Sequence, residues 1–121
     1  MKAFNWNHSV AYNETAKASF HATARSRLRL LAEKLQLYRG GFDLRSNKAG
    51  IAVSGEITLH ADSIYVQVQQ SCMGIGMGIL VRKCQGRRDY TGGRNHWFPL
   101  SLLNDVNELA YHVRTIMLAK E

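Results

Sequence analysis

The sequence has little cysteine, little proline and no long apolar run. Its two cysteines, Cys72 and Cys84, are too few for a disulfide framework, so we expect reduced thiols and a cytoplasmic protein. The single proline argues against a long disordered linker. The apolar stretch 74–81 is far shorter than the roughly 20 residues that cross a bilayer, and we expect no membrane contact. The N-terminal residues lack the pattern of a signal peptide.

The sequence is instead rich in positive charge. Sixteen Lys and Arg residues stand against nine Asp and Glu, which gives a net charge of +7 over 121 residues. Most of the cations are arginines, whose planar guanidinium groups suit bidentate contact with phosphate and stacking on bases. The hydrophobic fraction of 45% is enough to build a core. We therefore expect a single domain over residues 1–121, with a polyanion as the leading class of partner.

Two segments show the three-and-four spacing that is typical of an amphipathic helix. The segment 14–38 is followed by a glycine pair that we expect to end its helix, and Ser101 is the expected cap of a second helix over 102–119. The first apolar stripe comprises Phe20, Ala24, Leu28, Leu31, Leu35 and Tyr38. The second comprises Leu103, Val106, Leu109, Ala110, Val113, Ile116 and Met117.

Between these helices, over residues 42–98, the apolar period changes to two, as in half-buried antiparallel strands. Strands are expected at 42–44, 51–61, 64–69, 78–85 and 95–98, with Pro99 ending the last of them. Residues 1–12 fit either an edge strand or an arm. The expected fold class is α+β, an antiparallel sheet of about four strands flanked by an N-terminal and a C-terminal amphipathic helix, with one sheet face left open.

The segment Leu80–Phe98 carries the strongest functional signal. It holds five basic residues against one acid, interleaved with aromatic residues. Cations neutralise phosphates, and flat rings stack on unpaired bases, so this combination favours a single strand over a duplex. The residues expected to bind phosphate are Arg82, Lys83, Arg87, Arg88 and Arg94. Those expected to stack on bases are Tyr65, Tyr90 and Trp97, whereas Phe98 is expected in the core.

The same region resembles a known class of modules. Gly78-Ile79-Leu80-Val81-Arg82-Lys83 is followed by a Gly-rich basic hairpin and then by Phe98-Pro99-Leu100-Ser101-Leu102-Leu103, which leads into a helix. In this order, residues 51–118 are similar to the single-strand-binding module of the PUR repeats, the Whirly proteins and the positive-cofactor-four family. The long first helix departs from that pattern. The resemblance implies a homodimer that binds single strands across its sheet through Tyr65, Arg82, Lys83, Arg87, Arg88, Tyr90, Arg94 and Trp97.

Two other functions stay open on the sequence alone. One is a protein-interaction or inhibitor module of the phage or plasmid type, with its basic surface on an acidic protein partner. The other is a small metal-independent ribonuclease that uses His60 or His96. The leading expectation is a non-catalytic protein that binds single-stranded DNA or RNA with little sequence specificity.

We expect no cofactor and no metal. Cys72, Cys84 and His96 lack the close pairing that is typical of zinc ligands. The glycines at 74, 76 and 78 precede a predicted strand, whereas a phosphate-binding glycine loop precedes a helix.

Overall fold

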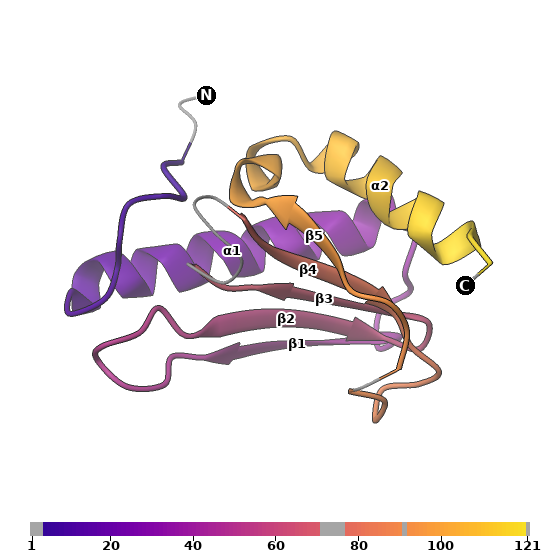
Figure 1. Ribbon diagram of the computed structural model, residues 1–121, viewed down its shortest axis with the longest axis horizontal. Helices are drawn as coiled ribbons and strands as arrows, with labels where there is room; N and C mark the ends of the chain where they lie inside the picture. The colour runs from indigo at the N-terminus through magenta and orange to yellow at the C-terminus, as the bar shows by residue number, and fades with distance from the viewer. Residues whose placement is uncertain (1–3, 71–76, 91, 121) are drawn as a thin grey trace.

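In the computed structural model, two helices pack against one antiparallel sheet (Figure 1). The structure describes residues 4–70, 77–90 and 92–120. The elements are α1 (Glu14–Lys34), β1 (Phe42–Asn47), β2 (Glu56–Ala61), β3 (Ile64–Val68), β4 (Met77–Lys83), β5 (His96–Pro99), the 3-10 helix η1 (Leu100–Asn104) and α2 (Val106–Leu118). The strands pair in sequence order, and each neighbouring pair is antiparallel. The predicted α+β class is confirmed, with five strands where about four were expected.

The core lies between the two helices and one face of the sheet. Alternate side chains of the central strands are buried on this face, namely Ile57, Leu59, Ile64, Val66, Val68, Ile79 and Val81. The helices complete the core with Phe20, Ala24, Leu28 and Leu31 from α1 and Leu109, Ala110, Val113 and Ile116 from α2. Because neighbouring side chains on a strand point to opposite faces, the intervening residues of these strands lie on the side away from both helices.

α1 ends earlier than the sequence predicts, because a left-handed residue stops it. Gln36 has a φ of 60°. Its N–H donates to the carbonyl of Glu33, and the N–H of Leu37 donates to that of Ala32, each at 3.0 Å. These two bonds form a Schellman motif, which a glycine usually completes. Tyr38, expected as the last member of the stripe, therefore lies beyond the helix and is exposed.

β2 is shorter than the predicted strand over 51–61. Ile51 and Val53 are exposed and belong to the connection between β1 and β2. Gly55 has a φ of +73°, and a side chain there would collide with the backbone of Asn47. The chain therefore leaves the extended conformation before Glu56, although the alternation of apolar residues continues through this point.

Of the N-terminal segment, residues 4–12 are described, and they form an arm and not an edge strand. Trp6 and Val10 are buried in the core. The side-chain amide of Asn104 accepts from the indole N–H of Trp6 at 3.0 Å, and that of Gln70 donates to the carbonyls of Trp6 and His8 at 2.9 and 2.8 Å. Two side-chain amides thus supply the partners that a neighbouring strand would otherwise give.

The last helix also begins differently from the prediction. After Pro99 the chain makes the 3-10 turn η1, so Ser101 lies one turn before α2. Asp105 caps α2 instead, and its carboxylate accepts from the N–H of Glu108 at 3.2 Å. The buried residues of α2 all belong to the predicted stripe, whereas Leu103 lies in η1 and Met117 is only partly buried.

Replacement of Gln36 by Gly is expected to raise the free energy of unfolding by roughly 0.5–1 kcal/mol, because a left-handed conformation costs an L-residue about 1–2 kcal/mol and the greater freedom of glycine in the unfolded chain offsets part of the gain. Urea unfolding followed by circular dichroism measures the change. Gln36→Ala is the matched control and should give no such gain. A destabilised Gln36→Gly variant would contradict the Schellman assignment.

Candidate nucleic-acid interface

The sheet face away from the helices, called the open face below, carries two cross-strand rows of side chains. The strand registers place Asp43, His60, Tyr65 and Arg82 in one row. The other row contains Arg45, Thr58, Gln67, Leu80 and Trp97. Side chains directly opposite one another on neighbouring strands lie about 4.5–5.5 Å apart at Cβ, so each row is a continuous surface.

The connection between β4 and β5 (the β4–β5 loop, described at residues 84–90 and 92–95) folds back onto the open face. The ring of Tyr90 lies 5.2 Å from that of His60 and 6.5 Å from that of Tyr65. Its hydroxyl accepts from Arg45 at 3.1 Å, and its carbonyl accepts from Arg82. The loop covers this end of the sheet, so His60 is only 2% exposed and Tyr65 only 8%.

Hydrogen bonds within the loop hold this conformation. The carboxylate of Asp89 accepts from the backbone N–H groups of Gln85 at 2.9 Å and Gly92 at 2.8 Å. Nε2 of His60 donates to the carbonyl of Gly86 at 2.9 Å, which joins the loop to β2. The short polar side chain of Asp89 therefore organises the turn, and His60 anchors the turn to the sheet.

Arg87 connects the loop to the start of β1 and to the β2–β3 turn. Its guanidinium group lies 3.6 Å from a carboxylate oxygen of Asp43 and 3.3 Å from one of Asp62, and it donates to the carbonyl of Gly40. The sequence analysis assigned Arg87 to phosphate binding. In the structure its donors are directed to these three protein partners, so its position indicates that it holds the loop in place.

Lys83 points to the opposite face from Tyr65 and Arg82. It pairs with Ile64, a buried residue of the core face. Its Nζ donates to the carbonyl of Ala119 at 2.5 Å, just past the end of α2. A cation near the C-terminus of a helix is stabilised by the unpaired carbonyls there, and this position separates Lys83 from the other predicted phosphate ligands.

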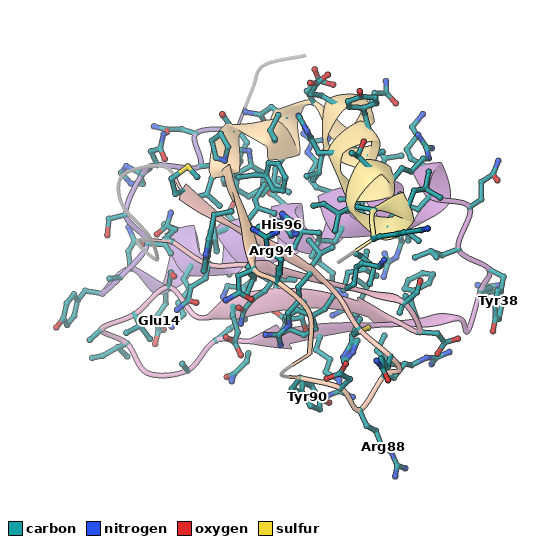
Figure 2. The ribbon with its side chains drawn as sticks, turned by 45° about the vertical axis from the view of Figure 1, so that its right-hand side comes forward. Glu14, Tyr38, Arg88, Tyr90, Arg94 and His96 are labelled. Carbon is teal, nitrogen blue, oxygen red and sulfur yellow. The ribbon has the colours of Figure 1, made fainter. Side chains whose placement is uncertain are left out.

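Three predicted contacts lie at the surface of this region. Arg88 points away from the body of the protein at the end of the loop, beside Tyr90, and Arg94 lies on the segment that returns to β5 (Figure 2). Trp97 pairs with Leu80 on the open face, whereas its neighbour Phe98 packs against His112 of α2 with 5.1 Å between ring centroids. Trp97 is partly exposed, as a ring available to a ligand must be.

The structure adds Arg45 to the candidate interface and gives Tyr65 a different role from the predicted one. Arg45 is exposed on β1 and donates to the hydroxyl of Tyr90, so it belongs to the same cluster as Arg82. The sequence analysis did not include Arg45 among the binding residues. The alternation of Asp43 and Arg45 with Phe42 and Leu44 was the signal that could have placed it on the open face. The guanidinium carbon of Arg82 lies 4.6 Å from the ring centroid of Tyr65, so this tyrosine supports a cation and is not itself an exposed stacking ring.

Two buried histidines are held in the neutral form. Burial lowers the pKa of His60, although its hydrogen bond to Gly86 acts in the opposite direction. Burial also lowers the pKa of His21, and the charges of Lys48 and Lys17 lower it further. His21 makes hydrogen bonds of 2.5 Å to the hydroxyl of Ser46 and 2.8 Å to the carbonyl of Ser54. As a neutral group, His21 therefore joins α1 to β1 and to the β1–β2 connection, and His60 joins β2 to the β4–β5 loop.

The two histidines of the ribonuclease alternative do not meet. His60 lies under the loop on the open face, whereas His96 pairs with Val81 and lies on the core side of the sheet. Cys84 is buried, and its thiol donates to the carbonyl of Ala61. Cys72 and the glycines at 74 and 76 lie outside the described residues.

The described residues show no metal site and no helix that could cross a membrane. Within residues 4–70, 77–90 and 92–120, no group of three or more His, Cys, Asp or Glu side chains is placed to hold a metal ion. Neither helix of that part of the chain combines the length and the apolar character needed to cross a membrane. No protein-family model, curated protein or solved structure matches this chain.

Acidification from about pH 7 to about pH 5 is expected to destabilise the protein, because the unfolded state takes up protons at histidines whose pKa is lowered in the folded state. The stability from this source is present above the ordinary histidine pKa and is lost as the pH falls below it. Urea unfolding at several pH values measures the slope. His60→Gln should flatten it, whereas His8→Gln, at an exposed position, is the control. An unchanged slope in His60→Gln would contradict the neutral assignment.

Proposed function

We propose that the protein binds single-stranded nucleic acid across the open face and the β4–β5 loop, and that it does so without catalysis. The observation that carries this proposal is the folding of the loop onto the sheet. It brings Arg45 of β1, Arg82 of β4 and Tyr90 of the loop into one connected cluster. Arg88 and Trp97 extend this cluster along the loop and along β5. Guanidinium groups beside aromatic rings are the combination that an unpaired strand requires.

The accessible rings favour a single strand over a duplex. Tyr90 is 46% exposed although it packs on His60 and Tyr65 in T-shaped contacts, so part of its ring is supported and part is open to solvent. Trp97 is partly exposed at the opposite side of the open face. A supported ring loses little conformational freedom when a base stacks on it, whereas the bases of a duplex are already stacked on one another.

Four acidic groups of this surface interact with partners within the protein. Asp43 and Asp62 interact with Arg87, and Asp89 accepts from backbone amides of the loop. Glu56 accepts from the side chain of Gln67 at 2.5 Å. The repulsion that these carboxylates would exert on a phosphate backbone is therefore reduced, while Arg88 extends from the loop toward solvent.

Removal of two exposed arginines of the β4–β5 loop tests the electrostatic part of the proposal. Arg88→Ala with Arg94→Ala should weaken binding of a single strand and reduce the steepness of log affinity against log salt by about 0.7 for each phosphate contact that is lost. Fluorescence anisotropy at rising salt measures both quantities. Arg29→Ala is the matched control, because Arg29 is exposed on α1 at the other side of the sheet. An equal effect of the control, or no effect of the double variant, overturns the proposal.

Replacement of Trp97 tests stacking separately from charge. Trp97→Ala should weaken single-strand binding by about 1–3 kcal/mol, as expected for one lost base–ring stack, and leave the salt dependence unchanged. Trp97→Phe keeps a flat ring and should retain most of the affinity. The same titrations with a duplex of equal length provide the comparison. A loss of duplex and single-strand affinity to the same extent would contradict stacking of Trp97 on an unpaired base.

A further inference from the structure

A cavity lies at the other end of the protein from the β4–β5 loop. Its volume is about 670 Å³, against about 300 Å³ for the hollow beside Lys83 and Gly93. The end of the N-terminal arm, the first turns of α1 and the loop at 48–51 form its walls. Figure 1 shows the start of α1 and the β1–β2 connection together at the left, whereas the β4–β5 loop lies at the lower right. Cavities of this size commonly hold small organic ligands.

Two hydrogen bonds between the walls hold the cavity open in a defined shape. The backbone N–H of Tyr12, on the arm, donates to the carbonyl of Ile51 at 2.7 Å. Nζ of Lys17, on α1, donates to the carbonyl of Gly50 at 2.8 Å. The arm and the helix are thus each fixed to the same loop, so a ligand would not have to order these segments when it binds.

Backbone strain is concentrated at the same place. Tyr12 and Ala49 have φ values of 61° and 53°, in the left-handed region that residues with a side chain seldom adopt. Among the described non-glycine residues, the third with a positive φ is Gln36, which ends α1. Tyr12 and Ala49 end no helix, and both line the cavity. Strained residues of this kind cluster at ligand sites, because there the conformation that directs the side chain is worth its cost.

The side chains around the cavity combine exposed apolar surface with positive charge. Tyr12 is 75% exposed and Ile51 64% exposed, so the lining presents apolar surface to a ligand. Lys17 and Lys48 supply two cations to the lining, and Glu14 supplies one acid.

The two lysines are suited to share an anion. Lys17 is only 6% exposed, and the carbonyl of Gly50 takes one of its three ammonium donors. Lys48 is exposed on the facing loop, and both lysines belong to the lining of the same cavity. Two ammonium groups beside an apolar wall suit an acidic group attached to an apolar body.

We propose that this cavity binds a small aromatic anion. The flat body of the ligand lies against Tyr12 and Ile51, and its acidic group accepts hydrogen bonds from Lys17 and Lys48. The site is separate from the surface proposed for nucleic acid, so each can be tested while the other is left intact.

Titration of the full chain with 8-anilinonaphthalene-1-sulfonate, a fluorescent aromatic anion, tests this site. One saturable site is expected, and the neutral analogue N-phenyl-1-naphthylamine should bind at least about tenfold more weakly, since it lacks the charge-assisted hydrogen bonds. Lys48→Gln and Ile51→Ser should each weaken the binding of the sulfonate. Their matched controls are Lys34→Gln and Val53→Ser, which change exposed residues outside the lining. Arg88→Ala should also leave the binding of the sulfonate unchanged.

Equal binding of the charged and neutral probes, or equal effects of the lining variants and their controls, overturns the proposal. Displacement of the sulfonate by 1-naphthoate or by 1-naphthyl phosphate shows whether a carboxylate or a phosphate is preferred, and failure of both also overturns it. The amide chemical-shift changes caused by the sulfonate can be measured on the unmodified protein, so this test does not depend on the folding of a variant. They are expected at residues 12–18 and 48–51, and changes confined to other segments contradict the site.

Discussion

Side chains alternate between the two faces of a strand, so a sheet that buries one face against helices must also accommodate the side chains of the other. Here the second face is not simply left to solvent. Thr58, His60, Tyr65 and Leu80 are buried there as well, and the β4–β5 loop brings Tyr90 over one end of the rows that they form. The rest of the surface depends on this cover, because it makes His60 and Tyr65 supports and leaves Tyr90 and Arg88 of the loop accessible, with Arg45 and Trp97 at the outer strands.

The loop is held by several weak contacts. Arg87 forms partly exposed ion pairs with Asp43 and Asp62, and each such pair contributes little by itself in water. The hydrogen bond from His60 and the two accepted by Asp89 add to these contacts. A loop fixed in this manner keeps an average position but can adjust locally at small cost. That property suits a surface for single strands, whose bases and phosphates vary in spacing along a flexible backbone.

Local patterns predicted the features that local forces determine. The stripes of α1 and α2, the period of the central strands and the shared face of Tyr65 and Arg82 all follow from periodicity. The end of α1 could not be predicted from periodicity. Gln36 adopts the left-handed conformation there, and a sequence usually indicates that conformation by a glycine. The position of Arg87 depends on acids from distant segments, and pattern alone does not choose among its possible partners. Homodimerisation and a cytoplasmic location stay predictions.

The arm has a consequence for the order in which the molecule assembles. The strands pair in the order of the chain, so the sheet can grow by successive hairpins with short loops to close. The bond from Trp6 to Asn104, by contrast, joins residues 98 positions apart. During synthesis Trp6 is made before any of the strands and Asn104 after all of them. The indole therefore cannot form this bond until all five strands have been synthesised, so the arm is fixed to η1 only after the sheet can already have formed.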